Sequence, residues 1–569
     1  MSKPPVHLLY TSFAQGIKDN VAPELWGTIP STMNDAVKHL PTIRKSYGEA
    51  PETLDELKKA MKSSLKKMGI LTGQTADNID RMHHGVVEAG QQPNCLGGPS
   101  LILNKIAYAV SLAEQASLVP LYYVADYDGV QPELTNTRLP SPSPKGLHIS
   151  YPLQPGMDNS TIHTVDNPPE GWLTKTLEKI ESNYRGLLKG SPVLEEKLGN
   201  LYHAFTIIKN AYYSTGNVSE FSTKIIGSIL NHEAGLHVPT YWHSMPETRH
   251  LFQEGYELLL SEPNRSRFIE ASNEAAESVE AAGYRSQIGL RKRDYVPFYL
   301  ECTACSHIRV ELKYSAEGSN AVVSGKCPKC GTLYSHSFNP TSPDLTEINT
   351  LIQPRVDSRQ VIIDSVIPVV AHIGGPGETS YYAEVIPAAR ALNLPFPVFL
   401  RYTRTFYNTP WNESKAKVIR DQGYRSIGNE DMYKTLGSWV DSRNRADKDG
   451  LANAHREIQK YIEFTYGDLL SQVDVLKRAV EEVKGRLREP GDRQPLIRQM
   501  RDKQRVLQDI ELYLSWAYGR FSPEKYGQEV NWNWLDLAVV SGIRDLMGVY
   551  KRIYNPQTPN SSMYYVNLS

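Results

Sequence analysis

The chain has 569 residues, a formal net charge of −1, and a composition that is 40% hydrophobic and 22% charged. This balance is typical of a folded globular protein and excludes a low-complexity disordered chain, while the length predicts two to four domains. A protein that coats nucleic acid normally carries a basic excess, so any such role here would require a local basic patch.

The N-terminal residues contain no basic stretch followed by a long apolar run, so no signal peptide is predicted. No segment approaches about 20 uninterrupted apolar residues, the length that a membrane helix needs. Four of the five cysteines form two Cys-x-x-Cys pairs, a pattern that suits a reducing compartment. We therefore expect a cytoplasmic protein that does not contact a membrane.

Residues 1–80 are predicted to be helical, and residues 81–245 to hold the first part of an α/β core. The apolar run HHGVVEAG is followed by the loop GQQPNCLGGPS, the helical stretch LILNKIAYAVSLAEQAS and a second apolar run, LVPLYYVAD. Strand, glycine-rich loop, helix and strand in this order are typical of a βαβ unit with parallel strands.

The same pattern recurs in residues 341–410, predicted to be the second part of the core. VIPVVAHI indicates a strand, GGPGETS a loop, YYAEVIPAARALNL a helix and FPVFLRYT a further strand. Two such units predict one doubly wound, Rossmann-like parallel sheet interrupted by a long insertion. The ligand of such a sheet binds beyond the carboxyl ends of its strands, where both glycine loops would lie.

The insertion begins with a Pro-rich stretch, residues 139–168, and continues with helices. Residues 246–297 are predicted to be a helical connecting region, and residues 298–340 a zinc ribbon. The chain would then end in a helical domain, residues 411–569.

Within this C-terminal domain, apolar residues are spaced 4, 3, 4, 3 and 4 apart, which indicates a heptad seam. With a returning helix, it predicts an antiparallel coiled-coil hairpin at about 455–518. Two interpretations stay open: the hairpin packs on the body of the protein, or it projects and forms a homodimer. The seam consists of Leu469, Val473, Leu476, Val480, Val483 and Leu487.

The two Cys-x-x-Cys pairs lie 21 residues apart, with strand-like sequence between them. Each pair places two thiolates on one tight turn, and two such turns complete a tetrahedral site for one Zn²⁺. Four thiolates leave no open coordination position, so the metal would be structural. Two disulfides or four unmetallated thiols are the alternatives. The predicted ligands are Cys302, Cys305, Cys327 and Cys330.

Both glycine-rich loops are candidates for binding a nucleotide such as ATP or ADP. A loop of this kind lets backbone N–H groups approach phosphates, and the following helix N-terminus adds partial positive charge. For the first loop, GQQPNCLGGPS, the alternative is a mere tight turn, and for Lys105 in the helix that follows it the alternative is a solvated side chain. The candidate ligand-binding residues are Gly90, Gln91, Gln92, Gly97, Gly98, Pro99, Lys105, Gly374, Gly375, Gly377 and Tyr381.

Three acidic residues accompany these loops. Asp126 and Asp128 close the second predicted strand, and Glu378 begins the second crossover helix. Acidic residues at the end of the strand suit recognition of an amine or hydroxyl, or of a Mg²⁺ ion, and simple turn capping is the alternative. We treat the three as candidate catalytic residues.

The two loop segments, from GQQ to the acidic pair and from the apolar strand to GGPGE and Tyr381, resemble the bacillithiol biosynthesis cysteine-adding enzymes. The resemblance implies a fold similar to class I synthetases and nucleotidylyltransferases, with a Rossmann-like core, a connecting region and a C-terminal coiled coil. It also implies a ligase that joins the carboxylate of cysteine to the amine of a glucosaminyl-malate.

This sequence departs from the family pattern in three places. Ala89 precedes GQQ where the family usually has threonine, the acidic pair lies in ADYDG, and the zinc ribbon is an addition to the connecting region. These departures leave the amino acid and the acceptor open. Two rival functions are an RNA- or tRNA-associated protein that uses the ribbon and the arginine-rich hairpin, and a non-catalytic scaffold.

Overall fold

A computed structural model describes residues 3–141, 147–189, 191–305, 307–408, 410–426, 437–438, 441–442, 447–521 and 528–568. Residues 142–146 of the Pro-rich stretch lie outside this description. Among the described helices, none combines the length and the apolar composition that a membrane-spanning segment requires.

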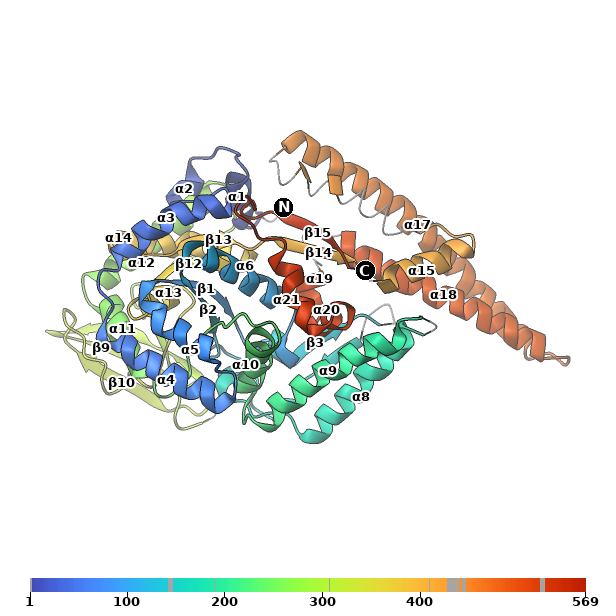
Figure 1. The fold of residues 1–569 in the computed structure, drawn as a ribbon. Helices are drawn as coiled ribbons and strands as arrows, with labels where there is room; N and C mark the ends of the chain where they lie inside the picture. Colours follow the sequence, from blue (N-terminus) through green and yellow to red (C-terminus); the bar gives the residue numbers. More distant parts are fainter. Residues whose placement is uncertain are drawn as a thin grey trace.

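A five-stranded parallel sheet forms the centre of the molecule, in the order β13-β12-β1-β2-β5 (Figure 1). The chain starts at the central strand, adds two strands on one side and later two on the other, which is the order of a doubly wound Rossmann-like sheet. The predicted fold is therefore confirmed. The strands are β1 (Val86–Gln91), β2 (Val119–Val124), β5 (Thr240–Trp242), β12 (Val369–Gly374) and β13 (Val398–Arg401).

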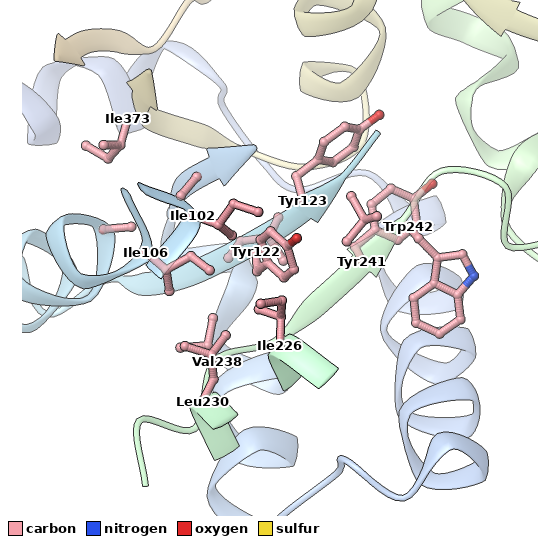
Figure 2. Packing of buried hydrophobic residues seen from close by; sticks show 14 of the residues in the cluster. Ile102, Ile106, Tyr122, Tyr123, Ile226, Leu230, Val238, Tyr241, Trp242 and Ile373 are labelled. Carbon is pink, nitrogen blue, oxygen red and sulfur yellow. The ribbon is translucent and has the colours of Figure 1, made fainter. Parts of the chain in front are cut away.

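Two crossover helices connect these strands, α6 (Leu101–Ala116) from β1 to β2 and α14 (Pro376–Ala391) from β12 to β13. Parallel strands need such crossovers, and their right-handedness places the two helices on opposite faces of the sheet. Strands covered on both faces are apolar throughout, and all six residues of β2 and of β12 are buried. Figure 2 shows side chains of α6, β2 and β5 packed together in this core.

Helices from the N-terminal segment and from the insertion complete the layers around the sheet. Helix α3 packs on β12 and β13 beside α6, while α1, α2 and α12 pack on α14. These helices are α1 (His7–Ala14), α2 (Val21–Trp26), α3 (Met33–Ser46), α4 (Glu52–Met68), α5 (Gly73–Asp80), α8 (Glu170–Leu187), α9 (Leu194–Tyr213), α10 (Val218–Ser228), α11 (Gln253–Leu260), α12 (Asn264–Ala281) and α13 (Arg359–Asp364).

The segment predicted as a zinc ribbon forms two small antiparallel sheets, in the orders β10-β9-β8 and β11-β6-β7. The second sheet includes β11, which follows the ribbon and leads the chain back toward the core. The strands are β6 (Phe298–Glu301), β7 (Arg309–Glu311), β8 (Lys313–Glu317), β9 (Asn320–Lys326), β10 (Leu333–Phe338) and β11 (Ile352–Pro354).

The C-terminal hairpin consists of α17 (Lys448–Arg486) and α18 (Gln494–Phe521), which project from the body in Figure 1. Its heptad seam is buried at Leu469, Val473, Leu476, Val480 and Val483. The predicted coiled-coil hairpin is confirmed, whereas its homodimerisation stays a prediction.

After the hairpin the chain returns to the core, which sequence reasoning did not anticipate. Strand β15 (Met563–Asn567) pairs in parallel with β14 (Arg404–Asn408), and helices α20 (Trp534–Ser541) and α21 (Ile543–Lys551) pack on α9 and α6. The indole N–H of Trp534 donates to the carbonyl of Leu96 at 2.8 Å, inside the first glycine loop. The C-terminal segment thus fixes the loop that follows β1.

We predict that Gly98→Ala destabilises the protein by about 1–3 kcal/mol, because Gly98 has a positive φ that a side chain disfavours. An added Cβ would also lie 2.5 Å from the Cβ of Asn94. Urea unfolding would measure the free-energy change. As a matched control, Gly199→Ala lies within α9 with no atom near its added Cβ and should stabilise by about 0.4–1 kcal/mol. Equal effects at both positions would contradict the prediction.

Candidate functional site

A cavity of about 830 Å³ opens at the carboxyl ends of β1 and β12, the point where the sheet order reverses. This is where a doubly wound sheet binds its ligand. Both predicted loops contribute to its wall, together with two of the three candidate acids. The predicted site residues that line it are Gly90, Gln91, Gln92, Pro99, Lys105, Asp128, Gly375, Gly377, Glu378 and Tyr381.

Lys105 connects the two halves of the sheet beneath this cavity. Its ammonium group donates to the carbonyl of Gly90 at 2.9 Å, to Oε1 of Gln91 at 3.3 Å and to Oε2 of Glu378 at 2.5 Å. An ammonium has three N–H donors, so all three are occupied. Lys105 therefore positions the ends of β1 and α14 rather than offering a free charge to a ligand.

Glu378 is held from several sides at the N-terminus of α14. Its Oε2 also accepts the backbone N–H of Gly375 at 2.6 Å, and its Oε1 lies 3.4 Å from Nε2 of His372. Burial alone would raise the pKa of Glu378, but Lys105 and His372 outweigh it and hold that pKa well below its usual range. The carboxylate is thus kept ionised at neutral pH.

A second carboxylate, Glu88, lies deeper in the sheet and is fully buried. Its Oε1 accepts from Arg359 at 2.5 Å and lies 3.2 Å from Nδ1 of His372. Burial opposes ionisation of Glu88, but Arg359 and His372 lower its pKa to about 2. Two ion pairs, Arg359 with Glu88 and Glu378 with Lys105, therefore lie beneath the cavity, and the imidazole of His372 lies between their two carboxylates.

The two aspartates have different surroundings. Asp126 is fully buried and does not line the cavity, and its carboxylate accepts from Ser219 Oγ at 2.7 Å and from the backbone N–H of Ser244 at 2.9 Å. Burial raises the pKa of Asp126, partly opposed by His163 and by these hydrogen bonds. This placement favours a role in holding β2 and β5 together over the predicted catalytic role.

Asp128 lines the cavity and accepts from two directions. The amide of Gln92 donates to its Oδ2, and Nη1 of Arg309 lies 3.1 Å from its Oδ1. Arg309 begins β7, whose register is fixed because Cys302 N donates to Ile308 O at 3.0 Å. The ribbon segment therefore positions a carboxylate of the cavity wall.

Three predicted glycines serve packing and do not line the cavity. An added Cβ at Gly97 would lie 2.9 Å from atoms of Ile225 and Trp534, and one at Gly374 would lie 2.5 Å from Phe399. Gly98 is similarly enclosed by Asn94. Loops follow β1 and β12 as predicted, but these three glycines allow close packing behind the loops rather than close approach of a ligand.

Several cavity residues were not predicted, because no local pattern distinguishes them from core or surface residues. They come from β2 and the turn after it, from β3 (Asn136–Leu139), from the segment after α12, from the start of α13, and from β14 and the residues just before it. Only the fold brings them to the same wall. They include Tyr123, Tyr127, Arg138, Gln287, Arg359, Tyr402 and Arg404.

The four predicted metal ligands come together at the ends of β6 and β9. Their Sγ atoms all lie within 4.8 Å of one another, and the structure contains no disulfide between them. Four thiolates bound at about 2.3 Å to a tetrahedral Zn²⁺ would have their sulfurs about 3.8 Å apart, so the cluster fits such an ion. It consists of Cys302, Cys305, Cys327 and Cys330.

We predict that Lys105→Met lowers the free energy of unfolding by about 3–5 kcal/mol at pH 7, because it leaves the buried Glu378 carboxylate without its cation. The wild-type pKa of Glu378 is depressed, so its stabilising contribution is present at neutral pH and is lost as the pH falls below the unfolded value. In the variant the pKa of Glu378 rises, so the difference between the two proteins should shrink on acidification.

Urea unfolding between pH 7.5 and pH 4 measures this convergence. The control is Lys62→Met, which removes a surface pair with Asp80 and should change stability by less than about 1 kcal/mol throughout. If the loss of unfolding free energy in Lys105→Met stayed constant with pH, the ion pair between Lys105 and Glu378 would not be its cause.

Comparison with known proteins places these features in a family. The family model described as "Bacillithiol biosynthesis BshC, N-terminal Rossmann-like domain" matches residues 37–402. A protein named "Putative cysteine ligase BshC" from Carboxydothermus hydrogenoformans is 23% identical over 440 residues, covering 72% of this chain and 76% of that protein.

Proteins of the same name from two other organisms are similar as well. The one from Thermus thermophilus is 26% identical over 391 residues, which cover 68% of this chain and 70% of that protein. The one from Staphylococcus epidermidis is 23% identical over 397 residues, which cover 65% of this chain and 61% of that protein. Because the family model spans well over half of its length and includes both glycine loops, this chain belongs to the bacillithiol biosynthesis BshC family.

Proposed function

We propose that this protein is a ligase that joins the carboxylate of cysteine to the amine of an aminosugar conjugate such as glucosaminyl-malate. One observation carries the proposal: both loops that resemble the family motifs, with Asp128 and Glu378, line a single cavity at the switch point of the sheet. The relatives' name, cysteine ligase, supports the same activity.

An amide does not form appreciably from a carboxylate and an amine in water, so the carboxylate must first be activated. Transfer of a phosphoryl or adenylyl group from ATP would supply a mixed anhydride, and the free amine would then displace phosphate or AMP. The protein's part in both steps is to orient the reactants and exclude water, and a cavity with a rigid charged floor suits that task.

We propose distinct roles for the two carboxylates of the cavity. Glu378 is committed to Lys105 and to the N-terminus of α14, so it positions the site. Asp128 is held by Gln92 and Arg309 at the edge of the cavity, where it could orient the attacking amine or accept its proton.

We predict that wild-type protein incubated with ATP, cysteine and glucosaminyl-malate forms the amide, detected by mass spectrometry. Asp128→Asn should lower kcat by about 10²–10⁴, the usual contribution of a general base. Glu133→Gln changes another carboxylate of the cavity wall, one that is exposed, and should keep most of the activity. Release of AMP or of ADP would identify the activated species. The proposal fails if no amide forms from cysteine, from other amino acids or from other aminosugars.

We also propose that the cysteine cluster holds a structural Zn²⁺, which would stabilise the ribbon by binding only its folded form. Nearby groups suit thiolates, since the hydroxyl of Tyr334 donates to the Sγ of Cys302 at 3.2 Å. Dimerisation through the hairpin, and the tRNA-associated and scaffold alternatives, remain predictions to be tested beside the ligase assay.

We predict about one zinc per chain by elemental analysis of protein purified without chelators, in keeping with one Cys₄ site. Cys302→Ser and Cys327→Ser should lose the metal and melt at a lower temperature, whereas Cys95→Ala, at a buried cysteine outside the cluster, should retain it. A metal-free wild type whose melting is unaffected by zinc would refute the site.

A further inference from the structure

Most of the charged side chains of the cavity wall that are buried or half-buried have partners of opposite sign. Lys105 is paired with Glu378 at 2.5 Å, and Asp128 with Arg309 at 3.1 Å. Arg359 is paired with Glu88 at 2.5 Å, donates to the hydroxyl of Tyr382 at 2.7 Å and lies over the ring of Tyr123. These groups neutralise one another, so they form the rigid part of the wall.

Arg404 is the exception. It lines the cavity with only 8% of its surface exposed, and its guanidinium has no hydrogen bond or ion pair with any residue that the structure describes. Its Nε is completely buried without a partner. The backbone beneath it is fixed, because Arg404 N donates to Ser562 O at 3.0 Å and β14 pairs with β15.

The nearby acid, Glu529, does not neutralise this charge. Its two oxygens accept from the backbone N–H of Thr405 and from the side chain of Asn104, each at 2.9 Å. Burial raises the pKa of Glu529 to about 7, although those hydrogen bonds and Arg404 oppose the rise. Glu529 is therefore only partly ionised at neutral pH.

A guanidinium that is buried without a partner destabilises the folded state, so stability does not account for Arg404. Its free N–H groups can form two parallel hydrogen bonds with a carboxylate or a phosphate, the oxyanions that match guanidinium geometry. We propose that Arg404 binds an oxyanion of a substrate, and that this cavity is therefore specific for an acidic substrate. The inference deepens the proposed ligase function and rests on it for the identity of the substrates.

The chemistry narrows which oxyanion this is. A guanidinium that binds both oxygens of a carboxylate leaves neither free to be activated, so it suits a group that does not react. In the proposed reaction those groups are the malyl carboxylates of the acceptor and the phosphates of the nucleotide. We do not expect Arg404 to bind the carboxylate of cysteine, because that group must react.

Calorimetric titration of the full-length protein tests this with three probes: cysteine, glucosaminyl-malate and ADP. Arg404→Met should weaken one acidic probe by about 10- to 150-fold, the effect of losing a hydrogen-bonded charge, and leave cysteine unchanged. Loss of glucosaminyl-malate binding would identify a carboxylate, and loss of ADP binding a phosphate. Arg185→Met, which removes a surface arginine paired with Glu181, is the matched control and should change none of the three affinities.

Two further measurements separate binding from folding and from turnover. Because the guanidinium of Arg404 has no partner in the part of the chain that the structure describes, Arg404→Met should unfold at a urea concentration no lower than wild type. Removal of a purely structural arginine would instead destabilise the protein. A wild type that forms amide while all three probes bind Arg404→Met normally would overturn this inference and leave the ligase function intact. Selective loss of an acidic probe without any amide formation would sustain the oxyanion site and reject the ligase function instead.

Discussion

The cavity depends on a single buried ammonium group. Lys105 comes from the first crossover helix, yet two of its three hydrogen bonds end on the last two residues of β1 and the third on Glu378, 273 residues further along the chain. The ends of parallel strands diverge at a switch point, and nothing in the sheet ladder itself holds the two following loops at a fixed separation. The ion pair does so, and it is strong because both groups are largely removed from water.

Further buried polar groups lie below the cavity. Glu88 and His372 are completely buried, and His372 lies between the carboxylates of Glu88 and Glu378. A carboxylate as deeply buried as that of Glu88 is tolerated only beside a partner of opposite charge, here Arg359. The result is a floor whose polar groups are already oriented before any ligand arrives, which is what electrostatic catalysis requires. Arg404 differs from these groups, because its guanidinium has no partner among the described residues, and we propose that it binds an oxyanion of a substrate.

Two distant parts of the chain complete the walls. The ribbon segment contributes Arg309, which holds Asp128 from outside the parallel sheet. Lys329, in the second Cys-x-x-Cys turn, donates to the carbonyl of Gly156 at 3.0 Å. On the other side the C-terminal return packs Trp534 behind the first glycine loop. The insertion and the C-terminal segment are therefore parts of the site as well as additions to the core.

Local sequence patterns were sufficient to predict the features that depend on short stretches of the chain. The apolar runs, the glycine-rich loops and their order along the chain predicted the two βαβ units and hence the sheet. The heptad seam predicted the hairpin, and the two Cys-x-x-Cys pairs predicted the clustered thiols. The sequence also identified the two loops that line the cavity, because a strand's end and the following helix are adjacent in the chain.

Which side chains face the cavity and which pack in the core depends on the three-dimensional fold. Asp126 and Asp128 are two residues apart, and within a strand they would share a face. One is enclosed by serines and the other lines the cavity, because β2 ends at Val124 and the chain turns between them. Lys105 became a clamp because Glu378 folds against it, and Arg404 came to the wall because β15 pairs with its strand. These contacts join residues far apart in sequence, and their energies depend on burial and on partners that no local pattern contains.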